Sequence, residues 1–209
     1  MATCALVAAS NFNAEHFQQA YELGLFDEIY AIDAGFAHLE AIECKPNVAL
    51  GDFDSLGYVP SCQRVVRHPV HKDKSDLELG MQRAVDYDFD EMVVYGALGG
   101  RLDHTLANLQ LFAKFAEQGV DITVIGDSYA IRPLVGPDAF DLPLLEQGTV
   151  SVFAFTDEAH GVIERGMEYS LDDETLTSRT SRGLSNELVG EPAAVAVEEG
   201  TLLVFYPLA

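Results

Sequence analysis

The stretch Val48-Ala49-Leu50-Gly51-Asp52-Phe53-Asp54-Ser55-Leu56 joins a short apolar run to two aspartates that stand two residues apart. On a chain leaving a strand, alternate residues point to the same side. We therefore expect Asp52 and Asp54 to face one cavity while Phe53 turns back into the protein. Two converging carboxylates at the end of a strand suit a hard divalent cation, usually Mg2+, and an open sheet binds ligands at that end. The alternative is a solvated turn.

The residues before this stretch alternate between strand and helix patterns. Small apolar residues predict a buried strand over 3–10, and Asn13 is expected to cap a helix that ends near Leu23. Residues 28–33 and 36–42 then repeat the strand and the helix. Such alternation is typical of a parallel sheet covered by helices.

The same alternation continues after the aspartates. Strands are predicted over 64–68, 91–96 and 120–126. The helix that opens near Asp76 has an apolar face of Leu77, Met81, Ala84 and Val85. A second helix runs to Gln118, with an apolar face of Leu106, Leu109, Phe112, Phe115 and Ala116.

From about Tyr129 onward the pattern changes to short β-like runs. These runs are separated by Gly, Pro and acidic pairs, and they cover 130–135, 149–155, 162–165, 193–197 and 202–206. This spacing favours a small antiparallel sandwich or barrel. We therefore predict an α/β plus all-β chain: a Rossmann-like parallel α/β domain over 1–130 and a β-sandwich over 131–209.

The composition is strongly acidic, with 12 Lys+Arg against 34 Asp+Glu and a formal net charge of −22. Such a charge repels nucleic acid backbones, so we expect no DNA or RNA partner. No apolar run is long enough to span a bilayer, and we expect no membrane association and no signal peptide. The three cysteines, Cys4, Cys44 and Cys62, have no metal-ligand spacing and indicate reduced thiols in a cytoplasmic protein.

A mixed polar segment precedes the helix that opens near Asp76. It combines cations, carboxylates and a hydroxyl: His71, Lys72, Asp73, Lys74, Ser75 and Asp76. Amides at the start of a helix favour phosphate, and lysines add positive charge. The two carboxylates could join Asp52 and Asp54 around metal ions. The alternative is that Asp73 or Ser75 only caps the helix and that the lysines are solvated.

A glycine-rich turn follows the strand predicted over 91–96. Its residues favour a nucleotide site over a plain tight turn: Gly99, Gly100, Arg101, Asp103 and His104. Glycines let backbone amides approach a phosphate, and a guanidinium can form a fork with it. Asn108, on the following helix, faces the same site or is exposed.

The pair Ser185-Asn186 lies between predicted strands, where such a pair is usually a turn. Three histidines, His16, His38 and His160, have no partner at ligand spacing and are expected to be surface or packing residues. The chain has no Gly-x-Ser-x-Gly motif, which argues against a serine hydrolase.

Taken in order, these motifs resemble those of the thiamine pyrophosphokinase family. The resemblance runs from about Ala31 to the C-terminus and rests on five short motifs: Ile32-Asp33-Ala34-Gly35, Leu50-Gly51-Asp52-Phe53-Asp54-Ser55, Lys72-Asp73-Lys74-Ser75-Asp76, Gly99-Gly100-Arg101-Leu102-Asp103-His104 and Ser185-Asn186. The family usually has Asp-Gly-Gly where this chain has Asp33-Ala34-Gly35. The resemblance implies an ATP-binding α/β domain, a thiamine-binding β-sandwich and a homodimer with active sites between subunits.

The resemblance also implies roles for individual residues. Five aspartates would surround Mg2+ and the triphosphate: Asp33, Asp52, Asp54, Asp73 and Asp76. Of these, Asp52, Asp54 and Asp76 are the expected metal ligands. The nucleotide would further contact Lys72, Lys74, Ser75, Gly99, Gly100, Arg101, His104 and Asn108. Thiamine would contact Ser185 and Asn186.

The reaction that the resemblance implies is transfer of pyrophosphate from ATP to the hydroxyl of thiamine, which releases AMP. Asp76 or Asp103 could accept the hydroxyl proton. A rival enzyme is a metal-dependent glycosyltransferase of the Asp-x-Asp type, which would leave the Lys72–Asp76 and Ser185-Asn186 motifs unexplained. A different class is a non-catalytic ligand-binding homologue.

Overall fold

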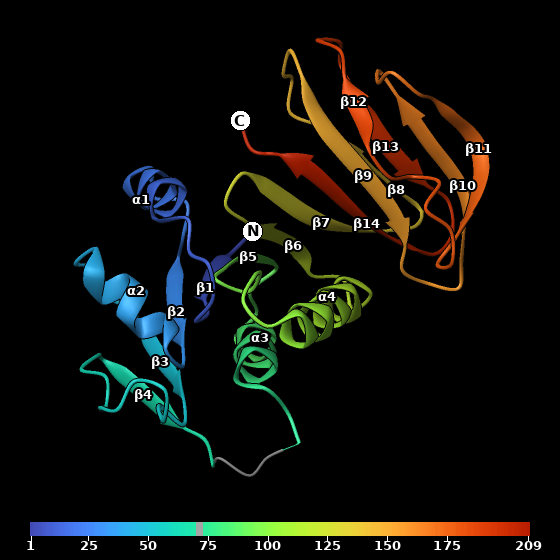
Figure 1. Cartoon of the computed structure of the whole chain (residues 1–209). Helices are drawn as coiled ribbons and strands as arrows, with labels where there is room; N and C mark the ends of the chain where they lie inside the picture. The colour runs from blue at the N-terminus through green and yellow to red at the C-terminus, as the bar shows by residue number, and fades with distance from the viewer. Residues whose placement is uncertain (70–72) are drawn as a thin grey trace. The chain divides into compact units, whose positions relative to one another are not determined.

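The computed structural model describes residues 1–69 and 73–209, so the expectations for His71 and Lys72 lie outside the described residues. The chain divides into two compact units (Figure 1). The first comprises Met1–Leu111 and Gly119–Asp127, and the second comprises Phe112–Gln118 and Ser128–Ala209. None of the helices in the described part of the chain is long and apolar enough to cross a membrane.

The first unit is built on a parallel sheet. Its strands are β1 (Thr3–Val7), β2 (Glu28–Ile32), β3 (Val48–Gly51), β4 (Arg64–Arg67), β5 (Glu91–Tyr95) and β6 (Asp121–Ile125). Their order is β6-β5-β1-β2-β3-β4, and every neighbouring pair is parallel. All four residues of β3 are buried. A strand that is covered on both faces is expected to read as a continuous apolar run, as Val48–Gly51 does.

Helices cover both faces of this sheet. They are α1 (Ala14–Glu22), α2 (Gly35–Ala41), α3 (Asp76–Asp86) and α4 (Leu102–Ala116). Figure 1 shows α1 and α2 on one face of the sheet and α3 on the other. Gly80 lets α3 approach closely, because a Cβ there would lie 2.4 Å from Cδ1 of Ile32. Asn13 caps α1 as predicted, accepting a hydrogen bond from the His16 amide at 3.1 Å.

The predicted apolar face of α4 needs a correction. The buried residues of this helix are Phe112, Ala113, Phe115 and Ala116, all in its C-terminal half. Leu106, which was expected on the buried face, is 54% exposed. Apolar spacing shows which residues share a helix face, but it does not show how far along the helix that face is covered.

The second unit consists of two antiparallel sheets. Its strands are β7 (Tyr129–Val135), β8 (Asp138–Asp141), β9 (Gly148–Ala154), β10 (Glu158–Arg165), β11 (Leu171–Thr177), β12 (Asn186–Leu188), β13 (Ala194–Val197) and β14 (Thr201–Pro207). Four of these strands pair antiparallel in the order β12-β9-β14-β7, and the other four form a separate sheet with the order β11-β10-β13-β8. The five predicted β-like runs are all strands, whereas β8, β11 and β12 were not predicted.

Candidate active site

The strand order of the first unit reverses beside β1, because β2, β3 and β4 lie on one side of it and β5 and β6 on the other. Open parallel sheets bind ligands outside the carboxyl ends of their strands at such a point. A cavity of about 440 Å³ opens here. Its polar lining comes from residues that follow β1 and β2, that begin α3 and that lie before or within the N-terminal half of α4: Ser10, Asp33, Ser75, Asp76, Arg101, His104 and Asn108.

Asp33 lies in this cavity directly after β2. Its backbone has a φ of 48°, a left-handed conformation that Asp tolerates better than most residues, and its amide donates to the Leu50 carbonyl at 2.8 Å. One carboxylate oxygen, Oδ1, is buried and has no hydrogen-bond partner among the described residues. Burial raises the pKa of Asp33; the Asp52 and Asp76 carboxylates add to this, while a hydrogen bond with Ser55 opposes it. Asp33, Asp52 and Asp76 therefore form one region of concentrated negative charge.

Two glycines allow the backbone to pack closely around Asp33. A Cβ at Gly51 would lie 3.0 Å from the Cα of Asp33, and a Cβ at Gly35 would lie 2.0 Å from the Val7 carbonyl oxygen. Ala34 has a φ of −65° and a ψ of −6°, which any residue can adopt. The backbone conformation therefore accepts alanine where the family usually has glycine.

The Asp52-Phe53-Asp54 segment turns as expected at its centre. Phe53 is 3% exposed and has a φ of 63°, so the prediction that it points into the protein is confirmed. The Asp54 amide donates to Oδ1 of Asp52 at 3.1 Å. Asp52 is half-buried and close enough to Asp33 to raise its pKa, whereas Asp54 is exposed. Neither side chain is among the described residues that line the cavity.

The carboxylates around Asp33 fit a magnesium ion that is shared with a substrate. Among residues 1–69 and 73–209, no group of three or more His, Cys, Asp or Glu side chains is arranged to hold a metal by itself. Mg2+ is usually bound by one or two carboxylates, with substrate phosphates and water as the other ligands. The buried, unpartnered Oδ1 of Asp33 and the adjacent negative charge meet that requirement.

The start of α3 forms one wall of the cavity. Ser75 is the N-cap, because its side chain accepts a hydrogen bond from the Glu78 amide at 3.2 Å. Of the two alternatives for the cap, Ser75 rather than Asp73 is therefore the residue observed. Asp76 is half-buried and lines the cavity, whereas Asp73 is exposed. Nζ of Lys74 lies 3.9 Å from Oε1 of Glu78, in the first turn of the helix.

The start of α4 forms the opposite wall. Gly99 and Gly100 have φ values of 88° and 65°, which favour glycine. Arg101 and His104 line the cavity, and both residues are exposed to solvent. Asn108 also lines it, and its side-chain amide donates to the Ala97 carbonyl at 2.8 Å, which ties α4 to the segment after β5.

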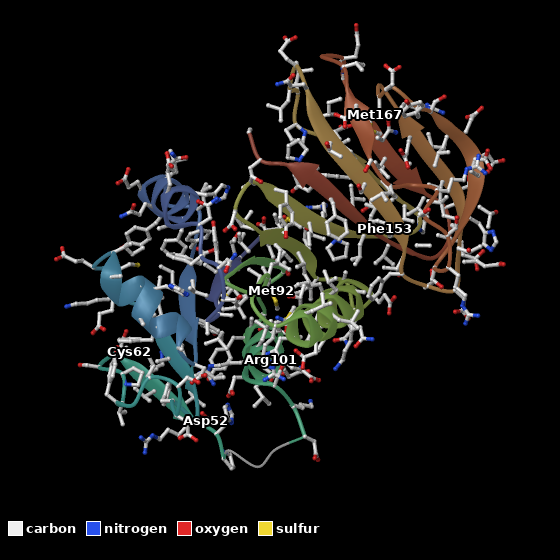
Figure 2. All side chains as sticks on the ribbon, in the orientation of Figure 1. Asp52, Cys62, Met92, Arg101, Phe153 and Met167 are labelled. Atoms are coloured by element: carbon white, nitrogen blue, oxygen red, sulfur yellow. The ribbon has the colours of Figure 1, made fainter. Side chains whose placement is uncertain are left out.

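Arg101 and Asp103 form a two-pronged ion pair. Nε of Arg101 donates to Oδ1 of Asp103 at 3.1 Å, and Nη2 donates to Oδ2 at 2.6 Å. This hydrogen bonding lowers the pKa of Asp103 and makes its carboxylate a weaker proton acceptor. Both side chains are exposed, so the guanidinium can exchange this carboxylate for a phosphate. Asp52 and Arg101 both lie toward the lower end of the first unit in Figure 2.

The predicted Ser185-Asn186 motif lies in the second unit, and its two residues differ in burial and in hydrogen bonding. Ser185 is exposed with a φ of 61°, and its amide donates to Oγ of Ser151 at 3.0 Å. Asn186 is 5% exposed and begins β12. Its Nδ2 donates to Glu164 and to the Tyr169 carbonyl, and its Oδ1 accepts from the amides of Tyr169 and Glu187. An asparagine side chain can donate two hydrogen bonds and accept two, so these four bonds use its full capacity.

Sequence reasoning missed three polar residues that the structure places at these sites. Ser10 lines the cavity because it follows β1, and finding it requires the strand order rather than a motif. Ser55, which follows the paired aspartates, lies close enough to Asp33 to lower the pKa of that carboxyl. Glu164 is a buried charge in β10 that no pattern in the sequence distinguishes from its exposed neighbours.

The fold and cavity define a two-unit protein in which a parallel α/β unit with a carboxylate-lined cavity precedes an antiparallel β unit. Two protein-family models match the chain. The model described as "Thiamin pyrophosphokinase, catalytic domain" matches residues 26–124, and the model described as "Thiamin pyrophosphokinase, vitamin B1 binding domain" matches residues 139–202. The chain therefore belongs to the thiamine pyrophosphokinase family, and it is an enzyme of thiamine diphosphate formation.

Individual relatives agree with this assignment. The chain is 26% identical over 181 residues to a thiamine pyrophosphokinase of Bacillus subtilis, covering 83% of this chain and 84% of that protein. The crystal structure of a Bacillus subtilis thiamine pyrophosphokinase superposes with a TM-score of 0.83 at 25% identity and covers 99% of both chains. The structure of a thiamin pyrophosphokinase from Candida albicans, at 13% identity, shares the fold with a TM-score of 0.82. The superposition covers 100% of this chain and 89% of the Candida albicans chain.

Proposed function

We propose that this enzyme transfers a pyrophosphoryl group from ATP to thiamine in the presence of Mg2+, giving thiamine diphosphate and AMP. The observation that carries the proposal is the cavity at the carboxyl ends of β1 and β5. It is lined by Asp33 and Asp76, by Arg101 and by residues at the starts of two helices. Phosphates, together with a divalent cation, complement such a mixed site.

In the proposed reaction, the hydroxyl oxygen of thiamine attacks the β-phosphorus of ATP. The bond from that phosphorus to the oxygen shared with the α-phosphate breaks, and AMP leaves with this oxygen. Such transfers depend mainly on positioning and charge stabilisation. Asp52 and Asp54 would hold Mg2+ together with Asp33, close to Asp76, and the ion would neutralise phosphate oxygens. Arg101 and the amides that begin α3 and α4 would hold the remaining phosphate charge.

Asp76 is the better of the two candidates to accept the hydroxyl proton. It lines the cavity and is half-buried. Asp103 is exposed, and its pairing with Arg101 lowers its pKa, which favours the ionised form and weakens it as a base. Asp73, Lys74 and Lys72, the last of which lies outside the described residues, are proposed to act at the phosphates rather than at the transferred proton.

The remaining proposals concern architecture and context. The reversal of strand order at β1 supports a Rossmann-like first unit, and the two antiparallel sheets support a β-sandwich in the second. The free thiols of Cys4, Cys44 and Cys62 are in keeping with a reducing, cytoplasmic setting. We also propose a homodimer on the basis of family resemblance. Light scattering of a fully active preparation should give twice the mass of the 209-residue chain; a monomeric mass would overturn the dimer.

Product analysis tests the proposed function. The protein is incubated with ATP, Mg2+ and thiamine, and the products are separated by liquid chromatography with mass detection. AMP and thiamine diphosphate should appear in equal amounts. ADP with thiamine monophosphate would instead identify a simple kinase, and unchanged ATP would favour a non-catalytic homologue.

A further inference from the structure

The second unit contains its own cavity of about 280 Å³, beside β10 and β12. The residues that matter to its chemistry are Glu164, Tyr169, Arg182, Leu184 and Asn186. All of them belong to this one unit. The cavity therefore has a defined shape whatever the arrangement of the two units.

Glu164 is the unusual member of this set. Its side chain is 1% exposed, and Oε2 accepts a hydrogen bond from Nδ2 of Asn186 at 2.6 Å. The other oxygen, Oε1, is buried and has no hydrogen-bond partner among the described residues. Burial raises the pKa of this carboxyl, and the bond from Asn186 opposes the rise. A buried acceptor that lacks a partner is costly to a fold, so its presence calls for an explanation.

No side chain nearby supplies the missing partner. Arg182, the cationic residue of the cavity, donates instead to Glu174 at 2.7 Å and is itself exposed. Within residues 73–209, which the structure describes without a gap, Glu164 forms no ion pair. The cavity thus presents an uncompensated acceptor that suits an N–H group of a ligand.

The walls of the cavity indicate what kind of ligand carries that N–H group. Tyr169 and Leu184 are 65% and 55% exposed, which is high for large apolar side chains. The Asn186 side chain holds the backbone of Tyr169 twice. Its Oδ1 accepts from the Tyr169 amide at 3.0 Å, and its Nδ2 donates to the Tyr169 carbonyl at 2.6 Å. An aromatic residue whose backbone is held by Asn186, together with a leucine and a buried acceptor, fits a flat heterocycle with an amino substituent.

We propose that Oε1 of Glu164 accepts a hydrogen bond from the exocyclic amino group of the thiamine pyrimidine. Asn186 is then a positioning residue, which holds the carboxylate through one hydrogen bond and the Tyr169 backbone through two, and does not itself contact thiamine. This inference rests on the proposed function, because that function supplies the ligand. It assigns to Glu164 the substrate recognition that the resemblance assigns to Asn186.

The test uses Glu164→Gln, which keeps the size of the side chain and replaces one of its two oxygens. The carbonyl oxygen of glutamine can still accept from Asn186, while its NH2 group replaces Oε1. Binding of thiamine is measured by calorimetry in the presence of Mg2+ and an ATP analogue whose α–β bridge is a methylene. The same titration is made with a thiamine analogue that carries oxygen in place of the exocyclic amino group. Glu168→Gln, an exposed glutamate in the same unit, is the matched control.

Wild type should prefer thiamine over the oxygen analogue by about tenfold or more, the usual effect of a hydrogen bond to a charged group. Glu164→Gln should bind thiamine about tenfold more weakly and lose that preference, with affinity for the ATP analogue unchanged. Glu168→Gln should behave as wild type. An unchanged preference in Glu164→Gln would overturn the inference, whether or not overall affinity falls. Failure of wild type to bind thiamine at all would overturn the proposed function itself, and the inference with it.

Discussion

A Cβ atom at position 51 would lie 3.0 Å from the Cα of Asp33, so Gly51 sets how closely the end of β3 approaches the cavity. Gly51 also has a φ of 153°, a conformation that is almost confined to glycine. The residue before the paired aspartates therefore supports Asp33 as well as Asp52. This contact links two motifs that belong to neighbouring strands.

Gly51→Ala should displace Asp33 and reduce both stability and turnover. We expect the free energy of unfolding to fall by about 1–3 kcal/mol, the cost of a residue held in such a conformation. Urea denaturation and steady-state assays would measure the two effects. Gly24→Ala is the control, since Gly24 has a φ of 70° but a Cβ added there would meet no atom within 4 Å. If both variants lose stability but keep full turnover, Gly51 has no role in placing Asp33.

Asp52→Asn and Asp54→Asn should each reduce turnover while leaving the protein folded. Loss of one metal-binding carboxylate removes several kcal/mol of charge stabilisation, so we expect a decrease of about a hundredfold or more in kcat at ordinary Mg2+. Asp88→Asn serves as the control because Asp88 is an exposed aspartate of the same unit that does not line the cavity. Near-normal kcat in either site variant would remove that residue from the proposed metal site.

Asn186→Ala should destabilise the second unit markedly. The change removes hydrogen bonds to Glu164, to both backbone groups of Tyr169 and to the Glu187 amide, and it leaves a buried carboxylate without any partner. We expect a loss of about 3 kcal/mol in the free energy of unfolding, measured by urea denaturation.

Ser185→Ala is the natural comparison for Asn186→Ala. The Ser185 hydroxyl is exposed, and the hydrogen bond to Ser151 uses the backbone amide, which alanine retains. The free energy of unfolding of Ser185→Ala should stay within about 0.5 kcal/mol of the wild-type value. Equal stability of the two variants would show that Asn186 is an ordinary turn residue.

The stability difference between wild type and Glu164→Gln should depend on pH. Burial raises the folded-state pKa of Glu164 above its unfolded value of about 4.3. The folded protein therefore favours the protonated form. The stability that this proton confers is fully present below the unfolded pKa and is lost as pH rises through the folded pKa. Relative to Glu164→Gln, wild type should thus lose Tm from about pH 4 upward and then level off.

Thermal denaturation of both proteins between about pH 4 and pH 8 would measure this effect, because the other carboxylates cancel in the difference. Glu168→Gln is measured over the same range as the matched control. A constant difference for Glu164→Gln would contradict a raised pKa for the buried carboxyl.

Much of the fold was predictable because its signals are local. Apolar runs gave the strands of the first unit, and Asn13 gave the start of α1. The missed strands lack such signals. β11 has the sequence Leu-Asp-Asp-Glu-Thr-Leu-Thr, and β8 has Asp-Ala-Phe-Asp. Both are edge strands of their sheet, where charged residues are tolerated because one side faces solvent.

The candidate site was predictable only in part, for a related reason. The sequence can indicate that Asp52 follows a strand, but the coupling of Asp33 to Asp52 and Asp76 depends on strand order and on the path of α3. The burial of Glu164 depends on pairing across the second unit. Asn186 looked like a turn residue because its four hydrogen-bond partners come from residues 164, 169 and 187, only one of which is adjacent to it.

The most direct test of the proposed reaction follows the β-phosphorus of ATP. The protein is supplied with thiamine, Mg2+ and ATP that carries a radioactive label only at this atom. Attack at the β-phosphorus predicts that thiamine diphosphate carries all of the transferred label and that the AMP released is unlabelled. Label that remains in ADP while thiamine gains a single phosphate would contradict pyrophosphoryl transfer at this site.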